Sequence, residues 1–404
     1  MKTLQASFRV LCRPLSLSLR LLLLAALASC GGGVGTGGTG GDATAYAAGP
    51  ITGFGSVVVG GVRFAVDSSV AVKDGDDVER SEGDLRLGMT VEIDSSAIST
   101  DNAGSSTASA RRIQFESEIR GPVGVVAVLA NSFTVLGQTV LVDGATVFDE
   151  RIAGGLQGLR AEDFVEVYAV FDAAALRYRA TRVEPASALG GLRLRGPVRL
   201  LDTATQTLTV GSNSYSYAGA SNVPAGLAVG QFVRLRMRLE SLRWVVNSFG
   251  ATPRVLSDGD GVKVEGLVSA YTSAASFSVN GRPVDASNAA LLPAGTTALA
   301  VGLRVEIEGV VRGGVFVASK VKVVSDSDLQ DRGFELIGDI TAADPGQQTI
   351  TLRGVTVSTA RSDLRIENGT LADLRPTQRV EVRGVLATDR RTLEATRIKI
   401  VRQS

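Results

Sequence analysis

The stretch LAVGQFVRLR (Leu227–Arg236) returns about 72 residues later as LAVGLRVEIE (Leu299–Glu308). Related phrases occur at three more places: LRLGMTVEID from Leu85, LRAEDFVEVY from Leu159 and LRPTQRVEVR from Leu374. Each follows a phrase that opens on glycine and then alternates apolar residues, with the opening glycines at Gly49, Gly121, Gly196, Gly266 and Gly338. A fixed spacing of this kind predicts an internal repeat of five units.

Within each unit the apolar residues recur at every second position, which is the period of a β-strand. In VRLRMRL the alternation places Val233, Leu235, Met237 and Leu239 on one face and Arg234, Arg236 and Arg238 on the other. Turn signals such as Asn280-Gly281 and Gly313-Gly314 separate the strands. We therefore predict an all-β fold of five tandem small OB-like β-barrels of about 70 residues each, with a split sandwich as the alternative.

The predicted organisation places a lipoprotein signal peptide and a glycine-rich tether before the barrels. The expected ranges are 1–29 for the signal peptide, 30–49 for the lipidated cysteine and linker, and 50–118, 119–188, 189–256, 257–325 and 326–404 for the five barrels. Ser325–Gly333 and the Asp-Gly pairs at 258–261 have the composition of linkers, and Ser96–Ala110 that of a long hairpin loop.

The repeated pattern of a glycine opening, then L-x-x-G-x-x-V-E-V, then A-x-x-V, resembles the bacterial family called domain of unknown function 5666. The resemblance covers Gly49–Val401 as tandem copies. It implies exported or lipid-anchored β-barrel repeats, and the family offers no catalytic residues to transfer. Unit two departs from the pattern at Ala161-Glu162, and unit three has Val233-Arg234-Leu235 where the family has Val-Glu-Val.

The first thirty residues are expected to address the chain to the cell envelope. A basic leader precedes the short apolar run Leu21–Ala28, and Leu27-Ala28-Ser29-Cys30 resembles a bacterial lipobox. The resemblance implies acylation of Cys30, with the bilayer as partner; an ordinary signal peptide with a chance cysteine is the alternative. Because Gly31 stands where Asp would favour the inner membrane, we expect the outer membrane, facing the periplasm or the surface.

Composition limits the chemistry. The sequence has no histidine, and its second cysteine, Cys12, lies in the leader. The usual zinc sites and the Ser-His-Asp and Cys-His nucleophile systems are therefore excluded. With 42 basic and 41 acidic residues, the overall charge points to no nucleic acid partner. We expect a non-enzymatic protein without a cofactor.

The small net charge conceals an uneven distribution. Residues 190–250 carry a net charge of +5, whereas residues 50–118 carry −6. Guanidinium groups near aromatic rings suit acidic glycans, lipopolysaccharide or nucleic acid. The candidate anion-binding residues are Arg234, Arg236, Arg238, Trp244, Tyr215 and Tyr217. The alternative is that acids of another unit balance the arginines and that the aromatic residues belong to the core.

Carboxylates gather in Lys73–Asp84, where Asp74, Asp76 and Asp77 form a candidate calcium site. The spacing does not match an EF-hand, so a solvated acidic loop is the alternative. A single outward glutamate also recurs at one strand position in four units, at Glu92, Glu166, Glu306 and Glu381, which favours a role in surface solubility or edge protection.

Together these observations predict a lipid-anchored structural or binding module of the cell envelope. Binding of an anionic glycan, lipopolysaccharide or nucleic acid through the third unit is the alternative function, although no specific nucleic acid partner is expected.

Overall fold

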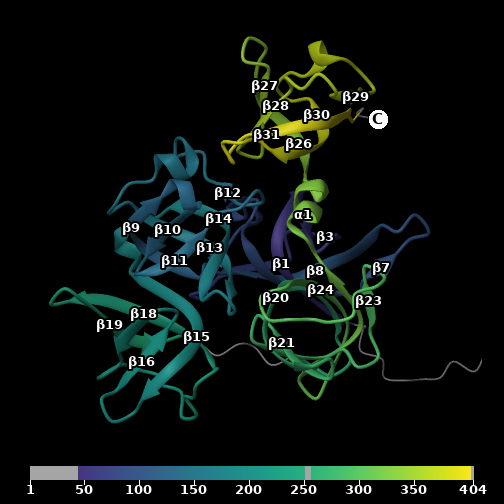
Figure 1. Cartoon of the computed structure of the whole chain (residues 1–404). Helices are drawn as coiled ribbons and strands as arrows, with labels where there is room; N and C mark the ends of the chain where they lie inside the picture. Colours follow the sequence, from purple (N-terminus) through teal and green to yellow (C-terminus); the bar gives the residue numbers. More distant parts are fainter. Residues whose placement is uncertain (1–43, 251–255, 402–404) are drawn as a thin grey trace, which may run out of the picture. The chain divides into compact units, whose positions relative to one another are not determined.

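The computed structural model describes residues 44–250 and 256–401. They form an all-β chain of small closed barrels, as predicted, with one short α-helix (Figure 1). No helix within these ranges has the length and apolar character needed to cross a bilayer.

Barrel 1 (44–115) shows how each ring closes. Its ring strands are β1 (Thr44–Phe54), β2 (Val57–Val59), β3 (Val62–Ala65), β6 (Thr90–Ser96) and β8 (Ser106–Phe115). Antiparallel pairings join β1 to β2, β2 to β3, β8 to β6 and β6 to β1, and a parallel pairing of β3 with β8 completes the circle. This order is that of an OB-like barrel, and closure removes the exposed edges that an open sheet would have.

The same circle of pairings recurs in four further segments. Barrel 2 (119–185) uses β9 (Ile119–Ala127), β10 (Ser132–Val135), β11 (Gln138–Leu141), β13 (Phe164–Asp172) and β14 (Arg177–Pro185). Barrel 3 (192–249) uses β15 (Leu192–Asp202), β16 (Thr207–Val210), β17 (Asn213–Ser216), β18 (Phe232–Glu240) and β19 (Arg243–Phe249).

Barrel 4 (261–323) uses β20 (Gly261–Ser273), β21 (Ser276–Val279), β22 (Arg282–Asp285), β24 (Arg304–Arg312) and β25 (Val315–Val323). Barrel 5 (334–400) uses β26 (Phe334–Asp344), β27 (Thr349–Leu352), β28 (Val355–Ser358), β30 (Arg379–Leu386) and β31 (Leu393–Ile400). Short strands and 3₁₀ turns decorate the rings: β4 (Ala71–Asp74), β5 (Glu79–Arg80), η1 (Glu82–Asp84), β7 (Ser99–Thr100), η2 (Val128–Ala130), β12 (Val147–Phe148), η3 (Gly155–Gly158), η4 (Ala188–Gly190), β23 (Ala290–Leu292), β29 (Arg365–Glu367) and η5 (Leu371–Asp373).

The first strands of the barrels also pair with one another. In β1, Ala45–Ala48 run parallel to Gly261–Val264 of β20, and Gly53 and Phe54 pair with the start of β26. Likewise β9 pairs with β15 around Ile119. The apolar cores follow these contacts, because one buried cluster is shared by barrels 1 and 5 and another by barrels 2 and 3. The barrels therefore do not behave as isolated beads, which suits units too small to bury much surface alone.

The alternation predicted for β18 holds for most of the strand. Val233, Leu235 and Met237 are buried in barrel 3. Leu239, the last apolar residue of that face, is 53% exposed. The physical reason is the length of the neighbouring strand: β15 pairs with β18 only as far as Leu192 opposite Met237, so Leu239 lies beyond the barrel wall.

Three stretches read as linker or loop contain regular structure. The helix α1 (Asp326–Arg332) occupies the expected linker before barrel 5, and Ser325 caps it by accepting a hydrogen bond from the Asp328 backbone N–H. The expected loop at 96–110 contains β7 and the first part of β8. Strand β1 begins at Thr44, so residues 44–49 of the expected tether are strand rather than linker.

Candidate functional site

Barrels 1, 2 and 3 are joined by short connections, and the one between barrels 1 and 2 carries charge. Only Glu116, Ser117 and Glu118 separate β8 from β9. The Glu118 side chain is buried, and that of Glu116 is only 10% exposed. A connection of three residues keeps its side chains close to both barrels. These carboxylates therefore lie where the barrels meet.

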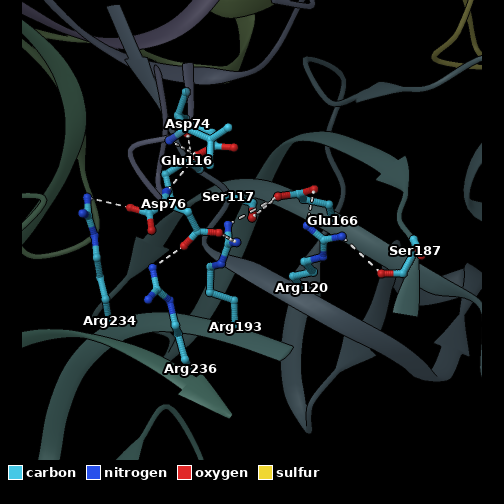
Figure 2. Close-up of polar contacts among 12 residues, drawn as sticks. Asp74, Asp76, Glu116, Ser117, Arg120, Glu166, Ser187, Arg193, Arg234 and Arg236 are labelled. Atoms are coloured by element: carbon cyan, nitrogen blue, oxygen red, sulfur yellow. Dashed lines mark hydrogen bonds and ion pairs between the residues drawn. The ribbon is translucent and has the colours of Figure 1, made fainter. Parts of the chain in front are cut away.

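Arginines of barrel 3 pair with these carboxylates and with Asp76. Arg234 on β18 lies 2.6 Å from Oε2 of Glu116, and Arg195 on β15 donates to Oε1 of Glu118 at 2.6 Å. Arg193 and Arg236 both donate to the Asp76 carboxylate of barrel 1. Figure 2 shows Arg193, Arg234 and Arg236 reaching from neighbouring strands toward these acids. We call this set of groups the charged junction.

Barrel 2 completes the junction through Glu166 on β13. Its carboxylate accepts a hydrogen bond from the Ser117 hydroxyl at 2.7 Å and lies 3.6 Å from the Arg120 guanidinium (Figure 2). Arg120 in turn donates to the Ser187 backbone carbonyl at 3.1 Å. The residues 186–191 that connect barrels 2 and 3 are thereby tied to the same network.

Burial governs the protonation of Glu116 and Glu118. Burial raises the pKa of Glu116 to about 7, and this effect outweighs the attraction of the neighbouring Arg234 and Arg195. Burial also raises the pKa of Glu118, against the lowering effect of Arg195. The Arg234–Glu116 contact is an ion pair without a well-formed hydrogen bond to Oε2, so the carboxylate is poorly solvated in its charged form. Burial therefore brings the pKa of Glu116 close to neutral pH.

Two cavities border the junction. One, of about 410 Å³, is lined by charged groups of three barrels, among them Asp74, Arg80, Glu166 and Arg193. The other, of about 80 Å³, lies where barrels 1 to 4 meet and is lined by Tyr46, Glu118, Phe171, Arg195, Phe232 and Arg282. Its volume suits a few water molecules rather than a large ligand.

The predicted anion-binding residues are not brought together as one binding surface. Arg234 and Arg236 pair with acids of barrel 1, and Arg238 pairs with Glu240 at 2.8 Å. Tyr215 and Tyr217 are buried in the core shared by barrels 2 and 3, whereas Trp244 packs at its edge. The two tyrosine rings therefore offer no exposed face for a base or sugar.

Tyr215 forms buried hydrogen bonds to barrel 2 instead. Its hydroxyl donates to the Leu136 carbonyl of barrel 2 at 3.0 Å and accepts from Gln138 at 2.8 Å. It thus joins barrel 3 to barrel 2 through a buried hydrogen-bond pair.

The candidate calcium residues are also engaged. Asp74 accepts from the backbone N–H groups of Asp76 and Val78 and from Arg80. Asp76 is paired with two arginines, and Asp77 is exposed at a φ of 60°. Across residues 44–250 and 256–401, no group of three or more His, Cys, Asp or Glu side chains is arranged to hold a metal ion. Cys30, the predicted lipidation site, lies outside the described residues.

A second charged cluster was missed by sequence reasoning. Glu265 on β20 is only 1% exposed, and it lies 3.3 Å from Arg304 and 2.8 Å from Arg332 of α1. Arg332 also contacts Glu306, one of the four repeated glutamates. The others face arginines as well: Glu92 faces Arg282, Glu166 faces Arg120, and Glu381 lies near Arg383. The recurrence of a glutamate at one strand position was the sequence signal for these contacts. In the structure, the four glutamates lie next to arginines, so their role is ion pairing and not solubility alone.

Comparison with known proteins matches three of the repeats to a family. Residues 120–184, 265–322 and 337–399 match the family described as Domain of unknown function (DUF5666). No curated protein matches the chain. A solved structure titled "drosophila Unr CSD456" is 13% identical and covers 57% of this chain and 99% of its own, with a TM-score of 0.14, which is too low to carry an argument. The three matched segments lie in barrels 2, 4 and 5, and these are the parts of the chain that match the family described as Domain of unknown function (DUF5666).

Proposed function

We propose that this chain is a non-enzymatic structural and binding module of the bacterial cell envelope, held to the bilayer by an acylated Cys30. Its barrels would act together as a support that presents exposed loops at the membrane. The lipobox-like Leu27–Cys30 and the glycine-rich stretch after it support the anchor.

The observation that carries the structural role is the charged junction. Its ion pairs join arginines of barrel 3 to Asp76 of barrel 1, to the Glu116–Glu118 connection and to Glu166 of barrel 2, and their charges face one another. A buried ion pair adds little net stability compared with an apolar pair, but removing one partner strands a buried charge at a cost of about 3–5 kcal/mol. Such pairs therefore select which barrel surfaces meet. This suits a support whose parts must keep one arrangement.

Binding of an anionic polymer remains the second candidate. Arg199, Arg238 and Arg243 are exposed on barrel 3, while the other arginines of the unit are occupied. A polyanion that used Arg234 and Arg236 would have to displace Glu116 and Asp76. We therefore expect weak, salt-sensitive binding at most.

Two experiments test the proposal. The first is metabolic labelling with an alkyne fatty acid followed by membrane fractionation; the wild type should carry the label, and Cys30→Ala should lose both the label and the membrane fraction. Retention of an unlabelled chain at the membrane would contradict the lipid anchor.

The second exchanges charges across the junction. Arg234→Glu should open the contact between barrels 1 and 3, increasing proteolytic cleavage near residues 186–191, and the double variant Glu116→Arg/Arg234→Glu should restore protection. Arg238→Glu, on the exposed pair, is the matched control and should leave cleavage unchanged. Equal cleavage in all variants would show that the junction does not hold the barrels together. Salt-dependent binding of an acidic glycan, lost in Arg234→Ala/Arg236→Ala/Arg238→Ala, would favour the second candidate.

A further inference from the structure

The hairpin between β18 and β19 has an unusual turn. Its two central residues, Ser241 and Leu242, have φ values of 50° and 62°. The equivalent turn of barrel 4, between β24 and β25, has φ values of 57° and 76°, and there the residues are Gly313 and Gly314. The two turns share one backbone shape, but only barrel 4 uses the residues that suit it.

Packing within the fold does not compensate for the backbone strain at Leu242. A branched side chain at positive φ crowds its own backbone. The Leu242 side chain is 92% exposed, so burial does not compensate for the conformation. Its exposed side chain is therefore available for a contact outside the chain.

The residues around the turn form an amphipathic tip. Leu239 is 53% exposed and pairs across the hairpin with Trp244, the only tryptophan of the sequence. Arg238 and Arg243 flank them and are exposed, and Glu240 offsets one of these charges. Leu189, 98% exposed, lies three residues before Leu192, which pairs with Met237 at the base of the same hairpin. The hairpin joins β18 and β19 at the end of barrel 3 where these strands extend beyond β15 (Figure 1).

We infer that this tip, Arg238–Trp244, docks onto an anionic phospholipid surface, with Leu239 and Leu242 entering the interfacial region and the two arginines contacting headgroup phosphates. Leucine and tryptophan between cationic side chains match the chemistry of such an interface. The inference rests on the proposed lipid anchor, because two leucines bind a bilayer weakly and need a tether to raise their local concentration.

The test uses Trp244 as a reporter at the proposed contact. The chain from Cys30 to Ser404 has a single cysteine, so it can be coupled through Cys30 to a maleimide lipid in vesicles. On vesicles containing phosphatidylglycerol, Trp244 emission should shift to shorter wavelength and be quenched several-fold more by brominated lipid than on phosphatidylcholine alone. Emission that is identical in free and vesicle-coupled chains would overturn the inference.

Matched variants separate docking from folding. Leu242→Gly keeps the turn and relieves its strain, yet it should abolish the quenching, as should Leu239→Ser/Leu242→Ser. Leu129→Ser is the control, because Leu129 is fully exposed on a hairpin turn of barrel 2 that has no neighbouring arginine or tryptophan. Quenching that survives Leu242→Gly would contradict the proposal. A blue shift that depends on protein concentration without vesicles would instead assign the tip to a second copy of the chain.

Chemical coupling supplies the anchor in this design, so its outcome does not depend on acylation in the cell. Failure of fatty-acid labelling at Cys30 would reject the anchor, whereas failure of quenching on coupled vesicles would reject the docking tip.

Discussion

The Arg234 guanidinium lies 2.6 Å from the Glu116 carboxylate, across the boundary between barrel 3 and barrel 1. Arg234 belongs to the strand face that the sequence periodicity predicts to be polar. Glu116 belongs to the three-residue connection between barrels 1 and 2. The two oppositely charged units are therefore two sides of one interface, which is the alternative that the sequence left open for these arginines.

Removal of Arg234 should lower the free energy of unfolding, because it leaves the Glu116 carboxylate buried without its partner. Arg234→Met is expected to lower the free energy of unfolding by about 1–3 kcal/mol at pH 8, where Glu116 is charged, and by less at pH 5.5, where it is protonated. Urea unfolding at the two pH values measures the difference. Arg238→Met, on an exposed pair, should change stability by less than about 1 kcal/mol. An equal effect of both substitutions would mean that the junction is not desolvated.

The raised pKa of Glu116 predicts a pH dependence of a definite sign. The folded state holds the proton up to a pKa of about 7, whereas the unfolded chain releases it near the ordinary glutamate value. The contribution to stability is therefore complete below the unfolded pKa and is lost as pH rises through about 7. Glu116→Gln should remove this loss, so that the stability of the variant relative to wild type rises by roughly 2–3 kcal/mol between pH 4.5 and pH 8. Parallel curves for the two proteins would contradict the shift.

The strained turn of barrel 3 should respond to glycine. Leu242→Gly is expected to raise the free energy of unfolding by about 0.5–1 kcal/mol, because glycine adopts the left-handed conformation without a clash. The reverse change in barrel 4, Gly314→Leu, should destabilise by a similar amount. Thermal unfolding of both variants provides the comparison, and a loss of stability in Leu242→Gly would show that the leucine packs against the fold after all.

The helix α1 should depend on the buried Glu265. Arg332→Met removes one of the two arginines that neutralise this carboxylate, so we expect a loss of about 2–3 kcal/mol and faster hydrogen exchange in residues 326–332. Asp331→Asn, on an exposed neighbouring residue, should leave both properties nearly unchanged. Unaltered exchange in Arg332→Met would indicate that α1 is held by other contacts.

Calcium should not stabilise the acidic run of barrel 1. Asp74 and Asp76 already accept from arginines and backbone N–H groups, and a cation would have to displace them. Millimolar calcium is therefore expected to shift the melting temperature no more than the same concentration of magnesium. A larger shift with calcium alone would revive the candidate site at Asp74, Asp76 and Asp77.

Local sequence patterns were sufficient for the strand rings. Alternation in VRLRMRL placed Val233 and Met237 in the core, and paired glycines at Gly313-Gly314 marked a hairpin. These features depend on neighbouring residues, so periodicity and turn chemistry report them directly. The same pattern does not reveal that Leu239 is exposed, because the end of a barrel wall depends on where the partner strand stops pairing.

By itself, the sequence determined the all-β class, the repeat and the family resemblance, because each rests on a short-range pattern written several times over. Only the tertiary structure decided what the charges do. Arg234 and Glu116 are 118 positions apart in the sequence, and the other pairs of the junction are also far apart. No local pattern predicts that they meet. Their pairing follows from how closed barrels pack through short connections, which is a property of the whole chain rather than of any one stretch.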